Sequence, residues 1–506
     1  MNPPFYITTT LPYVNAEPHV GFALEIIQAD VIARYHRLRG YDVFFNTGTD
    51  EHGLKIYQKA QEHGLDAQTY CDQYAARFDA LKGALDLSYT HFIRTTDMHH
   101  VRAAQEFWTR CFANGDIYKK NYHVKYCVGC ELEKTDSELV DGYCPLHPNR
   151  EIEFIDEENY FFQFSSYQRP LLHFYKSHPH FVAPDHRLQE IINFVSAGLQ
   201  DFSISRLKAK MPWGVPVPDD EEHVMYVWFD ALVNYISTIG WPNDEKAFYH
   251  FWGTPEHPNG IQVAGKDNLR QQSAMWQAML MSAGLPPSKQ IFIHGYIGSE
   301  GQKMSKSLGN VVNPFDVVER YGTDALRYYL LGAIPAHEDG DFSIGRFESF
   351  YTAHLVNGIG NLTSRIVTMI EKYLGGRVPK PSKDFLGAKR FWSAYETSVL
   401  GYQFDKLVEQ INEAVGLCDR TISEQKPWEK AKRGEDVSEL LYGLLEALRH
   451  IAFALLPVLP QTAEKILSQM GIASDVFGDW NAETAWGKLE EGSLVHKGEV
   501  LFPRLS

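Results

Sequence analysis

The apolar and polar positions of the first 50 residues predict a strand, a helix and a second strand. Residues 5–10 are β-branched and aromatic, which is typical of a buried strand, and 15–18 interrupt them with Pro18. Apolar side chains then recur at helical spacing from about residue 20 to 39, and Gly40 follows where a helix usually ends. Residues 42–47 form the next predicted strand. This order predicts a βαβ unit whose parallel strands carry a binding site at their carboxyl ends.

The remaining pattern predicts an interrupted α/β domain followed by helices. Residues of about 115–160 contain cysteines and short polar turns, and we expect a small inserted module there. Strand-like runs return near 223–230, 261–267 and 291–295, and helical periods follow at 347–374, 385–425 and 437–455. The predicted organisation is a Rossmann-like catalytic domain at 1–114 and 223–345, a connective insertion at 115–222 and an α-helical bundle at 346–506.

Length and charge constrain this picture further. A chain of 506 residues is too long for one hydrophobic core, so several domains are expected. The net charge of −16 means that a nucleic acid would have to meet a local basic patch against an unfavourable overall field. The sequence contains neither a secretory signal nor an apolar run long enough to cross a bilayer, so we expect no membrane partner.

One turn has the properties of a phosphate site. Pro18-His19-Val20-Gly21 opens the predicted helix, where unpaired N–H groups and a partial positive charge favour phosphate. Gly21 would let a nucleotide approach the backbone, and His19 could donate to phosphate oxygens. In isolation, a capped helix with a surface histidine explains the turn equally well.

A second motif lies about 280 residues later. Lys303-Met304-Ser305-Lys306-Ser307 is flanked by Gly298, Gly301 and Gly309, as a mobile loop would be. Its two lysines could stabilise the charge that develops on departing pyrophosphate. A solvated basic loop is the alternative, but the wide separation suits two halves of one nucleotide-binding sheet.

Three of the six cysteines lie within eighteen residues. Cys127-x2-Cys130 and Cys144-x2-His147 form two short pairs, the spacing of a tetrahedral zinc site with four protein ligands. Such a zinc is structural rather than catalytic, since no coordination position stays open. The other cysteines are scattered, which favours a cytoplasmic protein over a disulfide scaffold.

Together the two nucleotide motifs resemble the paired signatures of class I aminoacyl-tRNA synthetases. Further stretches narrow the resemblance to the methionyl-tRNA synthetase family, in its bacterial one-zinc form. They are Leu-Pro-Tyr-Val-Asn at 11–15, Thr-Gly-Thr-Asp-Glu-His-Gly at 47–53, Val-Trp-Phe-Asp-Ala at 227–231 and Asp-Ala-Leu-Arg-Tyr-Tyr-Leu-Leu at 324–331. The resemblance extends from about residue 5 to 504.

The resemblance implies a two-step ligase reaction. L-methionine attacks the α-phosphorus of ATP, with Mg²⁺ present, and methionyl-adenylate then passes to the 3′ end of tRNA(Met). The family's catalytic positions correspond here to His19, Gly21, Asp50, Arg206, Lys303 and Lys306. Its ATP contacts add His294 and Ser305. No magnesium-ligand motif is recognisable in the sequence.

The family's amino-acid pocket can be transferred residue by residue. Its apolar and aromatic members correspond to Leu11, Tyr13, Trp228, Ala231 and Tyr235, a surrounding that suits a thioether. Its polar members correspond to Asp50, Asp267, Asn268 and Gln272, with Arg206 expected to face the carboxylate. A purely structural role in the core is the alternative for Trp228 and Tyr235.

The helical region resembles the family's anticodon reader. Asn361 and Arg365 are four residues apart and share a helix face, and Trp428 follows Pro427 at the start of another helix. An amide, a guanidinium and an indole can read and stack unpaired bases. The resemblance therefore implies recognition of a CAU anticodon, although such residues are also common structural ones.

Three positions depart from the family pattern. Phe22 stands where the first signature usually ends in a second histidine, so one donor to ATP is missing. Asn268 and Gln272 replace an isoleucine and a histidine that are frequent in bacterial members. Gln272 can still hydrogen-bond a tyrosine hydroxyl or a sulfur, which keeps methionine as the expected substrate.

Two other functions remain open at this point. A paralogue could activate an amino acid for an acceptor other than tRNA, and the three departures favour it, whereas the anticodon positions oppose it. A non-catalytic RNA-binding module is opposed by the intact 303–307 motif. With no further dimerisation segment in the sequence, a monomer is expected.

Lys306→Ala should slow methionyl-adenylate formation at least about tenfold, or roughly 1.4 kcal/mol of barrier, because one cation facing pyrophosphate is lost. Methionine-dependent ATP–pyrophosphate exchange measures this step. Unchanged exchange in the variant would exclude the role assigned to the loop.

Overall fold

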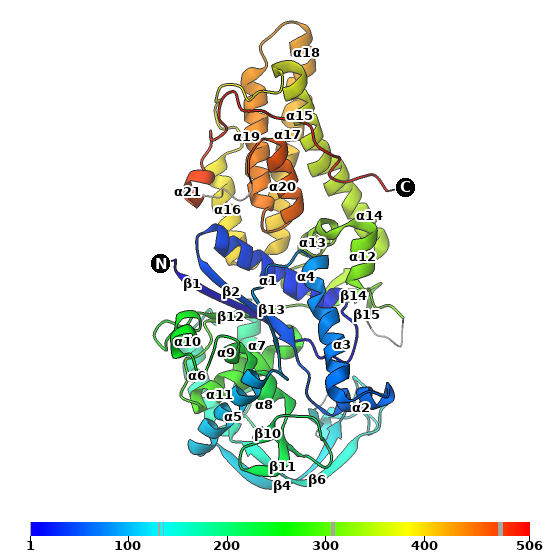
Figure 1. Ribbon diagram of the computed structural model, residues 1–506, viewed down its shortest axis with the longest axis vertical. Coiled ribbons are helices and arrows are strands. Elements are labelled where there is room, and N and C mark those ends of the chain that lie inside the picture. Colours follow the sequence, from blue (N-terminus) through cyan, green and yellow to red (C-terminus); the bar gives the residue numbers. More distant parts are fainter. Residues whose placement is uncertain (1, 130–131, 135, 305–308, 474–478, 506) are drawn as a thin grey trace.

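The fold is described from a computed structural model that covers residues 2–129, 132–134, 136–304, 309–473 and 479–505. Its centre is a six-stranded sheet in which all neighbouring strands are parallel, in the order β3-β2-β1-β12-β13-β7 (Figure 1). The strands are β1 (Pro4–Thr9), β2 (Asp42–Thr49), β3 (His91–Arg94), β7 (Val182–Ala183), β12 (Gly260–Gly265) and β13 (Gln290–His294).

The predicted βαβ unit is confirmed. Helix α1 (Val20–Leu38) connects β1 to β2, and these strands pair in parallel from Pro4↔Asp42 to Thr8↔Asn46. Gly40 has a φ of 80°, a left-handed conformation that ends the helix with little strain for a residue without Cβ. The local sequence therefore fixes the element that carries His19 at its amino end.

The first half of the catalytic domain continues through further helices. These are α2 (Leu54–Glu62), α3 (Ala67–Asp79), α4 (Leu81–Ala84) and α5 (Met98–Ala113). The second half contains α8 (Val227–Ala231), α9 (Asn234–Ser237), α10 (Glu245–Phe251), η3 (Lys266–Asn268), the π-helical η4 (Gln271–Met275), α11 (Trp276–Ser282), α12 (Pro314–Tyr321) and α13 (Thr323–Gly332). The strand-like run at 223–230 divides in the structure, because β11 (Asp220–Met225) ends just before α8 begins.

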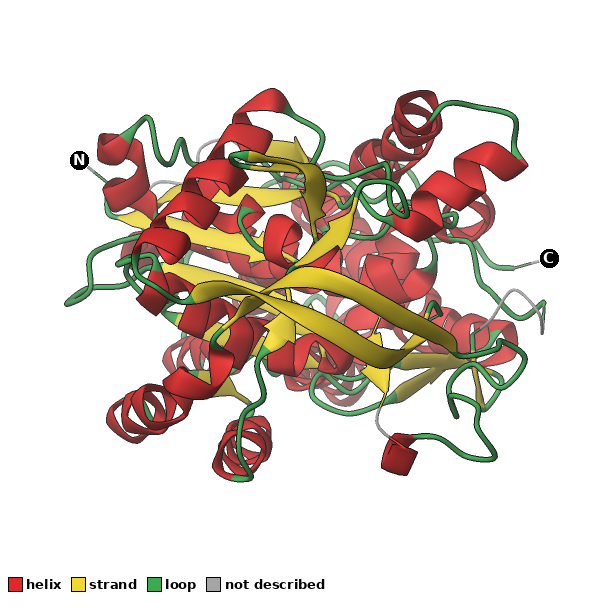
Figure 2. Ribbon diagram, turned by 90° about the horizontal axis from the view of Figure 1, so that it is seen from below, coloured by secondary structure: helices red, strands yellow, loops and turns green. Residues whose placement is uncertain are grey.

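The region predicted as an insertion carries a second sheet. Its order is β5-β4-β6-β8, from β4 (Ile117–Cys127), β5 (Leu132–Lys134), β6 (Glu153–Phe162) and β8 (Phe202–Ser203). Strands β4 and β6 pair antiparallel from Ile117↔Phe162 to Tyr126↔Glu153, a long ribbon that crosses the front of the view from below (Figure 2).

This region is not separate from the main sheet. Between α6 (Gln168–Ser177) and α7 (Asp185–Ser196), strand β7 pairs with β13 at Val182↔Ile291. Two small sheets complete the domain. One contains β9 (Ser205–Leu207), β10 (Pro216–Val217) and β11, and the other β14 (Ile297–Ser299), β15 (Gln302–Lys303) and β16 (Gly340–Phe342).

The described chain beyond residue 343 is mainly helical, as predicted. The first period is one continuous rod of α14 (Ile344–Phe350), π-helical η6 (Tyr351–Gly360) and α15 (Asn361–Leu374). The period at 385–425 is two helices, α16 (Ala388–Leu400) and α17 (Phe404–Gln425), because Tyr402 takes a positive φ of 55° between them. The others are α18 (Pro427–Lys432), α19 (Ser438–Leu455), α20 (Pro460–Gln469) and α21 (Trp480–Glu483).

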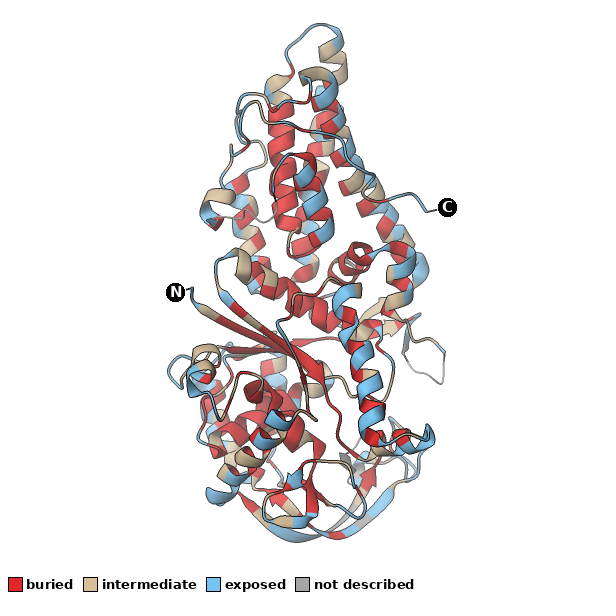
Figure 3. Cartoon of the chain, viewed as in Figure 1, coloured by how far each residue is buried: buried red, intermediate tan, exposed pale blue. Residues whose placement is uncertain are grey.

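The helical bundle sits directly on the sheet domain (Figure 1). Buried segments run through the main sheet and along the inward faces of the bundle helices (Figure 3). One hydrophobic cluster includes residues of α1, α13 and the bundle helices. A second cluster includes residues of α5, α7, α9 and α11. None of the helices in the described ranges is both long enough and apolar enough to cross a bilayer.

Candidate active site

A cavity of about 1650 Å³ opens at the carboxyl ends of the central strands. Ligand sites of open parallel sheets lie at this edge, where the strand order reverses. Twelve of the residues singled out from the sequence line the cavity together: Leu11, Tyr13, His19, Gly21, Asp50, Trp228, Ala231, Tyr235, Asp267, Asn268, Gln272 and His294. The fold thus joins the amino-terminal turn to segments more than 200 residues away.

His19 caps the first turn of α1. Its Nδ1 accepts a hydrogen bond of 3.1 Å from the Gly21 N–H, and burial by surrounding atoms lowers the pKa of its imidazole. The ring is therefore neutral near pH 7, and its proton lies on Nε2. His19 offers that proton to the cavity as a donor.

Gly21 is required by the position of His19. A Cβ at Gly21 would lie 2.9 Å from both Cε1 and Nδ1 of the His19 ring and 3.3 Å from Ile297 Cγ2. Any side chain here would displace the imidazole. Phe22, the departure from the family signature, points its ring edge-on to Phe78 with centroids 5.4 Å apart. It contributes an apolar part of the cavity wall in place of a donor.

A buried ion pair lies behind the nucleotide side of the cavity. His294 Nε2 is 2.9 Å from Glu25 Oε2, and His294 Nδ1 is 2.7 Å from the Gly295 carbonyl. Burial lowers the pKa of His294, but the Glu25 carboxylate and the Gly295 carbonyl outweigh it and raise the pKa above its ordinary value. With an acceptor at each ring nitrogen, His294 is a cation.

Glu25 was missed in the sequence, although it carries a recognisable signal. It is an acid between the apolar residues Leu24 and Ile26, in a helix that is largely buried. Its Oε1 accepts from both the N–H and the hydroxyl of Thr10, at 2.8 and 2.6 Å. Glu25 thereby ties α1 to the end of β1 and to β13.

The aromatic end of the cavity combines Trp228, Tyr235 and Gln272. Tyr235 is 2% exposed, and Gln272 Nε2 donates to its hydroxyl at 2.7 Å. The expected hydrogen bond between Gln272 and a tyrosine is confirmed. Among the described residues, the Trp228 indole N–H meets no hydrogen-bond acceptor.

A carboxylate network holds the wall that carries Trp228. Asp230 is fully buried, 2.6 Å from His52 Nδ1 and 2.8 Å from His100 Nε2. Burial alone would raise the pKa of Asp230, but the two imidazoles lower it to about 2. The carboxylate anchors α8 to the segment of β2 that presents Asp50.

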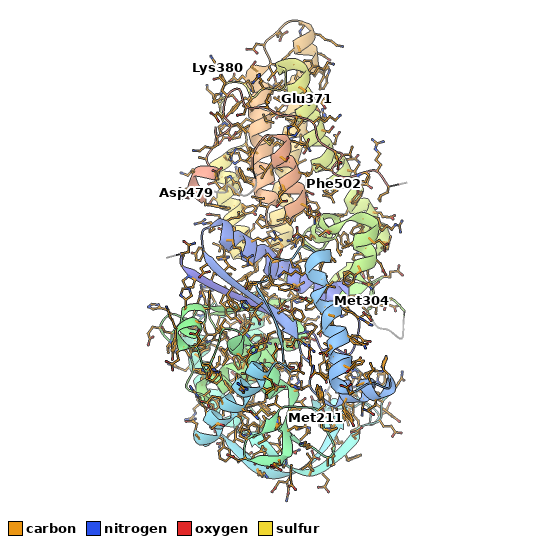
Figure 4. The ribbon with its side chains drawn as sticks, viewed as in Figure 1. Met211, Met304, Glu371, Lys380, Asp479 and Phe502 are labelled. Carbon is orange, nitrogen blue, oxygen red and sulfur yellow. The ribbon has the colours of Figure 1, made fainter. Side chains whose placement is uncertain are left out.

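Other predicted residues are placed differently. Arg206 does not line the cavity: its Nη1 donates to Ser203 Oγ at 2.8 Å and to the Ser205 carbonyl at 2.7 Å, and its guanidinium lies over Tyr226. The backbone of Lys303 pairs with Gly298 in β15. Its side chain, with Ser305, Lys306 and Ser307, lies outside the described residues. Met304, just before them, lines the cavity (Figure 4).

Three of the four predicted metal ligands come together. Ligand atoms of Cys127, Cys144 and His147 lie within 4.8 Å of one another. Cys130 lies outside the described residues. A Cβ at Gly129 would lie 2.4 Å from the His147 ring, so only glycine at position 129 lets His147 pack against the turn that follows Cys127. Lys55, at the cavity wall, donates to the Gly129 carbonyl at 3.1 Å and connects the two sites.

The predicted anticodon residues lie in the bundle, away from the cavity. Asn361 and Arg365 begin α15, and Arg365 is paired with Asp419 of α17 at 2.7 Å. Trp428 is half-buried in α18, two residues after Lys426 with its φ of 43°. All three stand on the helices to which the sequence assigned them.

This combination of parallel sheet, helix-terminal histidine turn and helical bundle defines a class I aminoacyl-tRNA synthetase. The family model described as tRNA synthetases class I (M) matches residues 5–153 and 146–367. The chain belongs to the methionyl-tRNA synthetase family.

Relatives of known sequence and structure agree. The chain is 43% identical to a methionine–tRNA ligase of Thermosynechococcus vestitus, over 100% of this chain and 98% of that protein. It is 42% identical to that of Thermotoga maritima, over 99% and 80%. The Mycobacterium tuberculosis methionyl-tRNA synthetase in complex with methionyl-adenylate superposes with a TM-score of 0.91 at 36% identity, over 99% of this chain and 100% of that one.

The Glu25–His294 pair should make stability depend on pH. Because the folded pKa of His294 is raised, its contribution is complete below about pH 6.5 and is lost as the pH rises through the raised value. The difference in unfolding free energy between the wild type and His294→Gln should therefore shrink as the pH rises above about 6.5. Urea unfolding at each pH measures it.

His354→Gln is the contrasting variant. Burial lowers the pKa of His354, so its contribution is present above about pH 6.5 and is lost as the pH falls. The difference in unfolding free energy between the wild type and His354→Gln should therefore grow as the pH rises, opposite to that for His294→Gln. A pH-independent difference for His294→Gln would show that the pKa of His294 is the same in the folded and unfolded protein, and would contradict the effect of Glu25.

Proposed function

We propose that the protein is a methionine–tRNA ligase that forms methionyl-adenylate from L-methionine and ATP and transfers the methionyl group to tRNA(Met). The observation that carries this proposal is the single cavity that joins the His19 turn to the Tyr235–Gln272 wall. One end suits a nucleotide and the other an apolar side chain with one polar atom. The names of the relatives support tRNA as the acceptor over a small molecule.

The activation step requires positioning and charge stabilisation. The α1 amino terminus and the Nε2 proton of His19 face the space where the triphosphate would lie, and Gly21 keeps that approach open. Lys303 and Lys306 would act on the opposite side, as the charge of pyrophosphate develops. His294 and Glu25 line the same cavity as an ion pair at 2.9 Å, so their charges balance.

The amino-acid end would be filled by methionine. Leu11, Tyr13, Trp228, Ala231 and Tyr235 supply an adaptable apolar surrounding for a thioether. Asp50 stands where it could hold the α-ammonium, at the end of β2 beside Tyr13. Asp267 and Asn268 line the same region. Arg206 is buried outside the cavity against Ser203, Ser205 and Tyr226, so it would act on the substrate carboxylate only indirectly.

Zinc fits the Cys127–Cys144–His147 cluster. Two thiolates and an imidazole are preferred zinc ligands, and Cys130 would be the fourth. The metal would stabilise the end of the β4–β6 ribbon, which has few hydrophobic core contacts of its own. Mg²⁺ would accompany ATP as its counter-ion. The buried free cysteines Cys71, Cys111 and Cys418 fit a protein that works as a monomer in the cytoplasm.

Charging assays separate the two steps and test the anticodon site. The wild type should support methionine-dependent ATP–pyrophosphate exchange and should charge a CAU-anticodon transcript. Arg365→Gln should lower charging at least about fivefold, since one base contact of about 1–3 kcal/mol is lost, and should leave exchange unchanged.

Arg110→Gln is the matched control, because it also removes a partly exposed arginine from a carboxylate pair, with Glu106 at 2.9 Å, but on α5 of the catalytic domain. Exchange without any charging by the wild type would instead favour a non-tRNA acceptor.

Metal analysis tests the zinc assignment. The purified protein should hold about one zinc per chain, and Cys144→Ser should lose it and melt at a lower temperature, because a staple of a small module is removed. Cys111→Ser, another buried cysteine, should keep the metal. Folded wild-type protein without any bound metal would overturn the site.

A further inference from the structure

A chain of buried hydrogen bonds runs from the amino end of β13 to the cavity wall. Its members are Ser288, Gln277, Gln262, Gln272 and Tyr235, none more than 2% exposed. Only the last two line the cavity. Buried amides are costly unless both their ends are satisfied, so the direction of each bond in such a chain is constrained.

The direction is set by backbone groups at Gln277. The Ser288 N–H donates to Gln277 Oε1 at 3.1 Å, and Gln277 Nε2 donates to the Gln272 carbonyl at 2.9 Å. A backbone N–H can only donate and a carbonyl can only accept, so the orientation of the Gln277 amide is settled. The same Nε2 donates to Ser288 Oγ at 3.0 Å.

The orientation of the Gln277 amide fixes which group donates in each of the next hydrogen bonds. Ser288 Oγ accepts from Gln277 and gives its one proton to Gln262 Oε1. The Nε2 end of Gln262 therefore faces Gln272, and donates to its Oε1 at 2.6 Å. Gln272 must then present Nε2 to Tyr235, whose hydroxyl oxygen accepts at 2.7 Å.

Tyr235 consequently has its own proton left to donate. Burial raises the pKa of the phenol far above its ordinary value, so the proton is present at every working pH. Tyr235 lines the cavity at its aromatic end. An amide at position 272 could turn either end toward Tyr235, and the chain behind it decides which.

We propose that Ser288, Gln277 and Gln262 are positioning residues that make Tyr235 a hydrogen-bond donor to the amino-acid side chain, and so determine substrate specificity. This inference rests on the proposed function. A donor at this place favours a side chain with an acceptor atom, the thioether sulfur, over one with a methylene of similar size. A site built to form a hydrogen bond rejects the analogue that lacks the partner.

The test compares methionine with norleucine, which has a methylene in place of the sulfur. Ser288→Ala removes the hydroxyl that fixes Gln262. The methionine-to-norleucine ratio of kcat/KM in pyrophosphate exchange should fall at least about fivefold, a modest factor because a thioether is a weak acceptor. The change should appear in KM for methionine, with KM for ATP unaltered.

Two controls separate this effect from loss of packing. Ser288→Thr keeps a hydroxyl and should retain the wild-type ratio. Ser282→Ala removes another buried hydroxyl, bonded to Asp116 at 2.7 Å and away from the cavity lining, and should also retain it. Gln262→Met, of similar length, has no group that can donate to Gln272 Oε1, and should lower the ratio as Ser288→Ala does.

The outcomes distinguish the two proposals. Wild-type protein without methionine-dependent exchange would refute the proposed function. Normal exchange with an unchanged ratio in Ser288→Ala, or in Gln262→Met where the alanine variant does not fold, would refute the role of the hydrogen-bond chain. A reduced ratio in Ser282→Ala as well would assign the effect to general loosening and would equally overturn it.

Discussion

The relation between the sheet domain and the helical bundle depends on the buried guanidinium of Arg327. This side chain is fully buried, 2.8 Å from Asp30 of α1, and donates to the carbonyls of Val458 and Pro457 at 2.9 Å each and of Leu85 at 3.0 Å. A buried cation is stable only when paired and fully hydrogen-bonded. The turn between α19 and α20 can therefore occupy only the place where the carbonyls of Pro457 and Val458 complete this set.

Asp30 makes the same contact important for the active site. Burial alone raises the pKa of its carboxyl, but Arg34, Arg327 and Ser88 together hold the pKa below its ordinary value. Since α1 also carries His19 at its amino end and Glu25 on its buried face, one helix connects the nucleotide turn, the His294 pair and the bundle. Any tilt of the bundle would act on the helix that positions His19.

The acidic character of the molecule extends into the cavity. The net charge is −16, and the described cavity lining contains six carboxyl side chains against the cations Lys55, Arg346 and His294: Glu17, Glu25, Asp50, Asp267, Asp339 and Asp341. An anionic group would therefore be held by the α1 amino terminus and by single cations at contact distance, because no net positive field draws it in. Lys55 also connects the cavity to the carbonyl of Gly129, beside the Cys127–Cys144–His147 cluster.

The sequence by itself determined the local elements and the chemistry available to them. The β-branched run before Pro18, the helical period after it and the two x2 spacings have local physical causes, so β1, α1 and the ligand cluster follow from them. Of the twelve cavity residues, His19 and Gly21 followed from the turn itself, whereas the resemblance to the family named the others.

Only the tertiary structure decided which side chains from distant segments contact one another. The sequence could not show that Glu25 faces His294, that Asp230 lies between His52 and His100, or that Gln262 directs Gln272, because each contact joins distant segments. Nor could it place Arg206 outside the cavity or return β7 to the main sheet. Hydrogen-bond direction and burial depend on packing across the whole chain, and no local pattern encodes them.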